Sequence, residues 1–90
     1  MKHSYLEVTY RKGKALAAYY YLPRRNEDRS ARTERVEADL LVDYTEDGRA
    51  IGIEIPFPSR LDPAQLNALL ERLGHETLGK EDLQPIRLVG

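Results

Sequence analysis

The segment VEADLLVDYTEDGRAIGIEI, residues 36–55, decides the fold of this chain. Apolar side chains recur at every second position on both sides of a polar stretch, Thr45–Gly48. Alternation with a period of two predicts half-buried strands, the first of them over residues 36–44, and the polar stretch predicts a turn between them. In the resulting hairpin a two-residue loop would pair Val42 with Ile53, and a four-residue loop would pair Val42 with Ile51. Both registers gather the apolar side chains on one face.

A first hairpin is predicted upstream, over residues 4–22. Its first strand alternates, and its turn is the basic sequence Arg11–Lys14. Its second strand, residues 15–22, is apolar on both faces, which is typical of a strand covered on each side or buried in an interface. One side of that strand carries Leu16, Ala18, Tyr20 and Leu22, and we expect Tyr20 to face the helix. Pro23 ends the strand, and residues 23–35 are expected to form a basic, polar loop.

A helix is predicted over residues 62–74. Asp62 is a favourable N-cap, Pro63 suits the first helical position, and Gly74 is a favourable C-terminal stop. The helix has an apolar stripe formed by Leu66, Leu69, Leu70 and Leu73. The tail, residues 75–90, allows a short edge strand at Ile86–Val89, a helical turn at Lys80–Leu83, or an arm that reaches a partner.

Together these elements predict a single α+β domain over residues 1–90. We expect a mostly antiparallel four-stranded sheet built from two hairpins, with one amphipathic helix packed on its apolar face. The chain has 14 basic and 15 acidic residues and no cysteine, which excludes disulfides, thiolate metal sites and a cysteine nucleophile. No stretch approaches the roughly 20 apolar residues of a membrane span, and the N-terminus lacks a signal-peptide core. We therefore expect a cytoplasmic protein that does not enter a membrane.

Residues 43–55, DYTEDGRAIGIEI, resemble the signature of the domain of unknown function 2283, a family of small prokaryotic proteins whose members read like VDYDEDGRVVGIEIL there. Upstream, Tyr10 and residues 18–22 are similar to the ends of the family's YDPEADALYIRL strand pair. Arg11–Lys14 replace the acidic residues of that hairpin. The resemblance covers about residues 5–58; it implies a small β-rich domain and supplies no catalytic residues.

The sequence contains no recognisable catalytic motif, so we expect a protein that is not an enzyme and needs no cofactor. A weaker possibility is a metal site. Asp39, Asp43 and Glu54 are expected on the outer face of the second hairpin, and close carboxylates bind hard cations. The alternative is a solvated acidic face with arginine partners.

Two surfaces are candidates for binding a macromolecule. Arginines follow the tyrosine triplet, and arginine with tyrosine suits single-stranded RNA or DNA; these residues are Arg24, Arg25, Arg29, Arg32 and Arg35. The second surface is the outer side of the first hairpin, where we expect Ala15, Ala17, Tyr19 and Tyr21. Tyrosine is favoured at interfaces, so a two-fold homodimer through this side is the leading hypothesis, and cover by the C-terminal tail is the alternative. The sequence thus favours a non-enzymatic, homo-oligomeric interaction or regulatory protein with an unknown protein partner, ahead of a nucleic-acid-binding protein.

Overall fold

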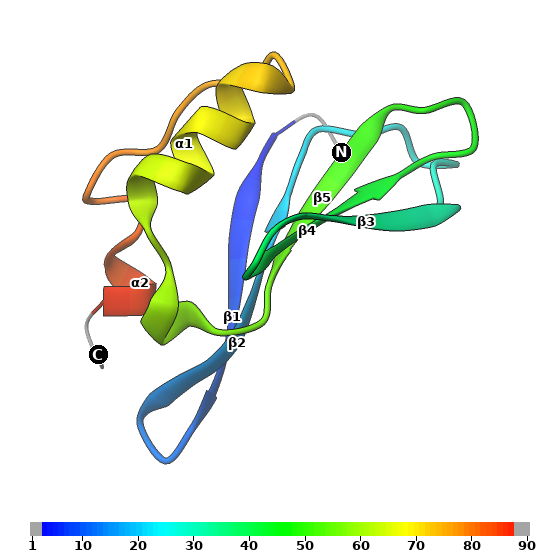
Figure 1. Cartoon of the computed structure of the whole chain (residues 1–90). Helices are drawn as coiled ribbons and strands as arrows, with labels where there is room; N and C mark the ends of the chain where they lie inside the picture. Colours follow the sequence, from blue (N-terminus) through cyan, green and yellow to red (C-terminus); the bar gives the residue numbers. More distant parts are fainter. Residues whose placement is uncertain (1–2, 88–90) are drawn as a thin grey trace.

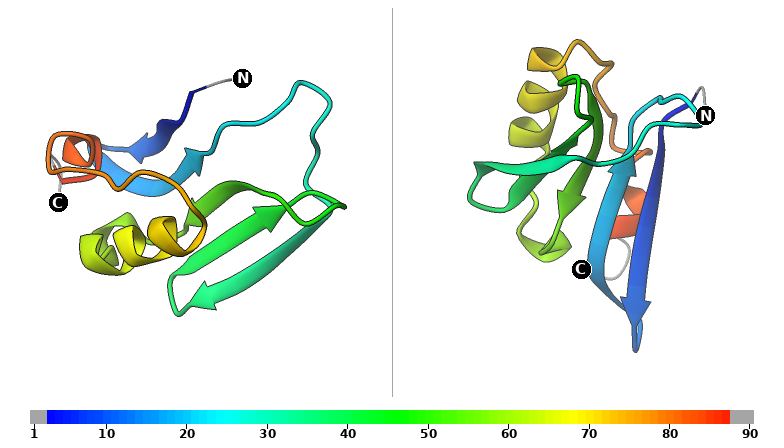
Figure 2. Two further views of the ribbon diagram at one scale, coloured as in Figure 1. Left: turned by 90° about the horizontal axis from the view of Figure 1, so that it is seen from above. Right: turned by 90° about the vertical axis from the view of Figure 1, so that its right-hand side faces the viewer.

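The computed structural model describes residues 3–87, which form one five-stranded antiparallel sheet with helices on one side (Figures 1 and 2). The strand order in the sheet is β1-β2-β5-β4-β3. The elements are β1 (Tyr5–Arg11), β2 (Lys14–Tyr21), β3 (Arg32–Glu37), β4 (Leu40–Tyr44), β5 (Ala50–Ile55), the 3-10 helix η1 (Pro58–Arg60), α1 (Pro63–Arg72) and α2 (Gln84–Arg87). The α+β class is confirmed, and the sheet has one strand more than predicted. Neither described α-helix has the length and apolar content needed to cross a membrane.

The fifth strand arises because the predicted strand 36–44 is in fact part of a hairpin. The chain turns at Ala38 and Asp39, and β3 folds back on β4, so residues 32–35 are strand and not loop. Val36 is an extra residue, a β-bulge, between Arg35 and the turn. A two-residue turn shifts the alternation by one, and the bulge shifts it back. Even-numbered side chains therefore keep the same face in both strands, which hides the break from a periodicity argument.

The second predicted hairpin, β4–β5, pairs Val42 with Ile53, as the two-residue loop requires. A bulge at Ile51 then shifts the pairing near the turn, so Tyr44 pairs with Ala50 and the loop is longer than two residues. Gly48, in this loop, has a φ of +91°, a conformation that glycine adopts without steric cost.

The tail is helical at Gln84–Arg87, so the alternative of an edge strand there is wrong. Leu83 and Ile86 lie three positions apart, and both are buried against the sheet. That spacing puts both side chains on one side of a helical turn, whereas a strand would point them to opposite sides. Leu88 and Val89 lie outside the described residues.

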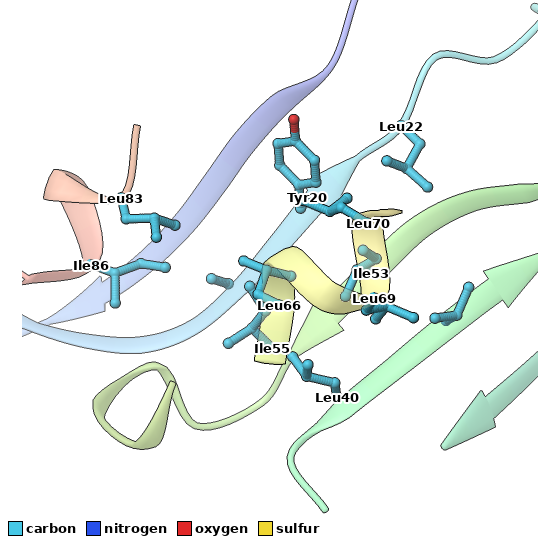
Figure 3. Close-up of a cluster of buried hydrophobic side chains, with 12 residues drawn as sticks. Tyr20, Leu22, Leu40, Ile53, Ile55, Leu66, Leu69, Leu70, Leu83 and Ile86 are labelled. Atoms are coloured by element: carbon cyan, nitrogen blue, oxygen red, sulfur yellow. The ribbon is translucent and has the colours of Figure 1, made fainter. Parts of the chain in front are cut away.

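The core fills the space between the sheet and the helices (Figure 3). Its fully buried side chains include Leu22, Val42, Ile53, Ile55, Leu66, Leu70 and Leu83. Tyr20 is buried among them, which confirms that it faces the helix. Leu16 does not join the core, because a bulge between Thr9 and Tyr10 leaves it without a partner in β1, and its side chain is 55% exposed.

Helix α1, Pro63–Arg72, lies within the predicted range 62–74, and the predicted residues Asp62 and Gly74 flank its two ends. The Asp62 carboxylate accepts a hydrogen bond from the Ala64 amide at 2.9 Å, which satisfies one of the free donors of the first turn. At the other end Gly74 has a φ of +80°, and the His75 amide donates to the Leu70 carbonyl at 2.9 Å. This Schellman ending directs the chain back toward the sheet, where the tail completes the core.

Replacing Leu66 by alanine tests the packing of α1 on the sheet. Leu66 is fully buried, so Leu66→Ala should lower the free energy of unfolding by about 2–5 kcal/mol through lost contacts and a residual cavity. Urea denaturation measures the change. Leu16→Ala is the matched control and should cost less than about 0.5 kcal/mol, because that side chain is largely exposed. Equal effects of the two substitutions would contradict this core.

Candidate functional site

The face of the sheet opposite the helices, here called the outer face, carries a row of side chains that crosses all five strands. Tyr19 of β2 pairs with Glu7 of β1 on one side and with Glu54 of β5 on the other. Glu54 pairs with Leu41 of β4, which in turn pairs with Arg35 of β3. Paired residues of antiparallel strands point to the same side, so these five side chains share the outer face.

No described helix covers the outer face, and the described part of the tail does not cover it either. Leu83 and Ile86, the buried residues of the tail, belong to the core on the opposite side of the sheet. The alternative that the C-terminal tail shields the tyrosines is therefore wrong for the residues described. Tyr5 and Phe57 each leave 47% of their surface exposed, so this face presents aromatic groups to solvent.

The outer face is hollowed at its centre by a cavity of about 520 Å³, here called the outer hollow. Its apolar walls are formed by Ala17, Tyr19, Leu41, Pro56 and Phe57. Three charged side chains, Glu7, Arg35 and Glu54, also line it. Apolar walls with a few charged groups are typical of a surface that binds a partner or a ligand.

Tyr19 is positioned over β5 by a missing side chain. A Cβ atom at Gly52 would overlap the Tyr19 ring, so only glycine leaves room for the ring to cross the strand. The Tyr19 hydroxyl then donates a hydrogen bond to Asp43 Oδ2 at 2.5 Å, and Thr33 donates to Oδ1 of the same carboxylate. Asp43 is buried, and each of its two carboxylate oxygens accepts one of these hydrogen bonds. Burial, followed by the hydrogen bond to Asp43, raises the pKa of Tyr19, so this tyrosine stays protonated near neutral pH.

The predicted interface tyrosines do lie together. Tyr21 stacks on Tyr5 with ring centroids 4.3 Å apart, and its ring lies 4.6 Å from that of Tyr19. The Tyr21 hydroxyl also donates to Glu7 at 3.3 Å. Ala17 lies beside them and lines the outer hollow. Ala15, in contrast, lies beyond the β-bulge and pairs with Tyr10, whose hydroxyl donates to the Pro85 carbonyl on the helix side. Ala15 therefore does not share the outer face with the tyrosines, contrary to the prediction.

Glu54 is the unusual charged residue of this face. Its half-buried carboxylate makes no hydrogen bond or ion pair with another described residue. Burial raises the pKa of Glu54, and the negative charge of Asp43 raises it further. A carboxylate in this state gains from an incoming cation.

The structure does not gather all three carboxylates predicted as a metal site, although Asp43 lies near enough to Glu54 to raise the pKa of Glu54. Asp39 lies in the β3–β4 turn, 3.9 Å from Arg60, and Asp43 is bound to Tyr19 and Thr33. Among residues 3–87 no group of three or more His, Cys, Asp or Glu side chains is placed to hold a metal ion.

The five arginines of the predicted nucleic-acid surface are dispersed and mostly engaged with their own chain. Arg24 donates to the Ile51 carbonyl and lies over the Tyr21 ring; Arg29 donates to the carbonyls of its own loop. Arg32 and Arg35 are strand residues: Arg32 pairs with Glu34 and lies over Tyr44, and Arg35 donates to the Ala38 carbonyl and lines the outer hollow. For Arg25 the contact is a backbone one, from its amide to Asp28.

An ion pair that sequence reasoning missed holds the arginine-rich loop in place. Both guanidinium NH₂ groups of Arg49 donate to Asp28, at 2.8 and 2.7 Å, and the Asp28 side chain is almost fully buried. Hydrogen bonds from Arg49 hold the pKa of Asp28 below its ordinary value. No sequence signal joins these residues, which lie 21 positions apart. A signal did exist for the approach of Tyr19, because Gly52 interrupts a run of isoleucines within a strand.

Gly52→Ala tests the contact that positions Tyr19. The added methyl group should displace the ring and lower the free energy of unfolding by about 1–3 kcal/mol. Gly79→Ala is the matched control and should change stability little, since a Cβ there meets Asp82 only at 3.7 Å. In a Tyr19→Ala background, Gly52→Ala should cost nothing further. Additive effects of the two substitutions in urea denaturation would contradict the contact.

Arg49→Met tests the ion pair with Asp28 through its pH dependence. The lowered pKa of Asp28 stabilises the fold above the unfolded-state pKa of about 3.9, and this stabilisation is lost as pH falls through the folded-state pKa. The Tm of the variant should therefore be lower than that of wild type. The difference in Tm should be largest above about pH 5 and should shrink as the pH falls toward about 2. Arg72→Met removes an exposed arginine and is the control. A difference independent of pH would count against the ion pair.

Comparison with known proteins identifies one similarity. Residues 17–56 match the model of a family described as protein of unknown function (DUF2283). This part of the chain runs from β2 to the end of β5 and includes Tyr19, Asp43, Gly52 and Glu54. No curated protein and no solved structure matches the chain. The resemblance inferred from residues 43–55 is thus confirmed, and over residues 17–56 the chain is similar to the DUF2283 family.

Proposed function

We propose that this protein is a non-enzymatic interaction module that forms a homodimer through the outer face of its sheet. The observation that carries the proposal is the uncovered outer hollow, with its aromatic walls. Aromatic groups contribute large contact area at interfaces, and a hollow of this kind loses its exposed apolar surface when a partner fills it.

A second copy of the chain suits this face because a two-fold interface must be self-complementary. The outer face has a hollow, and the Phe57 ring in its wall is about half exposed, so an open hollow and an accessible aromatic group lie on one surface. It also carries both charge signs, with Glu7 on β1 and Arg35 on β3 at opposite ends of one row. Homodimerisation also adds buried apolar surface to a chain of 90 residues, which has a small core of its own.

Nucleic-acid binding receives less support from the same structure. A surface for phosphates needs several arginines directed outward together, whereas Arg24, Arg29, Arg32 and Arg35 each donate to groups of their own chain. The arginine-rich loop is better explained as a connection that is held against the β4–β5 turn by Asp28 and Arg49.

Ala17→Glu tests the dimer without disturbing the core, because Ala17 lies half-exposed in the outer hollow. Wild type should sediment as two chains of 10.3 kDa each. Burying an unpaired carboxylate should weaken the dimer by about 100-fold or more in Kd. Ala68→Glu makes the same change on the exposed side of α1 and should leave the Kd unchanged. A monomeric wild type, or a fully dimeric Ala17→Glu variant with unchanged circular dichroism, would overturn the proposal.

A further inference from the structure

We propose that the basic tip of the β1–β2 hairpin, Arg11–Lys14, docks on the outer face of a second copy, where Arg11 and Lys14 meet the carboxylates Glu7 and Glu54 of the partner subunit. This inference rests on the proposed homodimer and names the segment that fills its interface. It also predicts that the contact occurs twice, because each copy supplies one tip and one acidic surface.

The tip is a narrow projection formed by the ends of β1 and β2 and the turn between them. It extends beyond the rest of the chain (Figures 1 and 2). Lys12 and Gly13 have φ values of +53° and +78°, which define a two-residue turn that suits the twist of a hairpin. All four residues of the tip are exposed, and the side chains of Arg11, Lys12 and Lys14 make no ion pair with a described residue.

The alternation of β1 directs the tip's charges toward the outer face. Glu7 and Thr9 both line the outer hollow, and Tyr10 turns to the helix side, so Arg11 returns to the outer face. Lys14 pairs with Arg11 across the hairpin and shares that face. One face of one hairpin thus carries cations at its tip and a carboxylate nearer its base.

Two-fold symmetry brings these opposite charges into contact. If two outer faces meet with the axis across the strands at the Thr9–Ala17 pair, each hairpin runs antiparallel to its partner. Arg11 lies two residues beyond Thr9, and Glu7 lies two residues before it, about 7 Å from the axis in each case. Arg11 of one copy therefore lies over Glu7 of the other. Lys14 of the first copy lies over Tyr19 on β2 of the other, and its long side chain reaches toward Glu54 on the adjacent strand β5 of that same copy. An interfacial cation also supplies the partner that the half-buried Glu54 lacks within its own chain.

Two charge-reversed variants test the contact. Arg11→Glu/Lys14→Glu places acids over acids, and Glu7→Lys/Glu54→Lys places cations over cations. Each variant alone should show a Kd for self-association raised by about 100-fold or more. Mixed in equal amounts, the two should form a heterodimer, because both tip contacts are then restored. Arg72→Glu/Lys80→Glu reverses the same number of charges on exposed residues outside the sheet and should leave the wild-type Kd unchanged.

Native mass spectrometry at fixed ionic strength distinguishes the outcomes. A dimer of wild type, monomers of each variant and a one-to-one complex in the mixture would establish the docking. Suppose that wild type is a dimer, that Ala17→Glu makes it monomeric and that the tip variant Arg11→Glu/Lys14→Glu stays dimeric. This result would overturn the docking of the tip and would still support a dimer through the outer face. Disruption of both variants without recovery in the mixture would also overturn it. A monomeric wild type would overturn the docking and the dimer together.

Discussion

The packing of the leucine stripe of α1 on one face of the sheet is the interaction on which the remaining structure depends. Leu66, Leu69 and Leu70 are buried against Ile53 and Ile55, and the tail adds Leu83 and Ile86 beside them. The described residues contain two α-helices, of ten and four residues, and a 3-10 helix of three residues, and these helices cover a single side of the five-stranded sheet. The other side is left to solvent or to a partner. The asymmetry between the two faces therefore follows from the small amount of helix within residues 3–87, all of which lies on one side of the sheet.

The uncovered face is organised rather than merely exposed. Gly52 lets Tyr19 cross β5, and Tyr19 and Thr33 donate hydrogen bonds to the carboxylate of the buried Asp43. In this position Tyr19 lines the outer hollow together with Ala17. Glu54 is then the one carboxylate of the row without a donor among the described residues, and burial raises its pKa. The proposed interface would use the anchored Tyr19 ring, the open hollow and the carboxylate of Glu54.

The basic residues of the loop after β2 and those of the β1–β2 tip differ in the contacts that they make. In the loop after β2, arginines bind carbonyls of their own chain and the loop is fastened by Asp28 and Arg49, so these cations stabilise local structure. At the β1–β2 tip the side chains of Arg11 and Lys14 make no ion pair with any residue within 3–87. Both segments are basic in sequence, but the side chains of Arg11 and Lys14 at the tip are available to contact a second molecule, whereas Arg24 and Arg29 of the loop are engaged with carbonyls of their own chain.

The sequence by itself determined the elements whose signals are local. Alternation over residues 36–55 predicted the central hairpin, and the caps at Asp62 and Gly74 specified α1, because these patterns involve neighbours along the chain. The alternation left two registers open, and the structure has the one that pairs Val42 with Ile53. It also identified Tyr19 and Tyr21 as an outward-facing pair. Only the tertiary structure decided the fifth strand, the bulges that displaced Ala15 and Leu16, and the Asp28–Arg49 ion pair. The physical reason is that a bulge preserves the parity of a pattern while it changes the pairing, and that an ion pair between distant residues forms only after the sheet has brought them together.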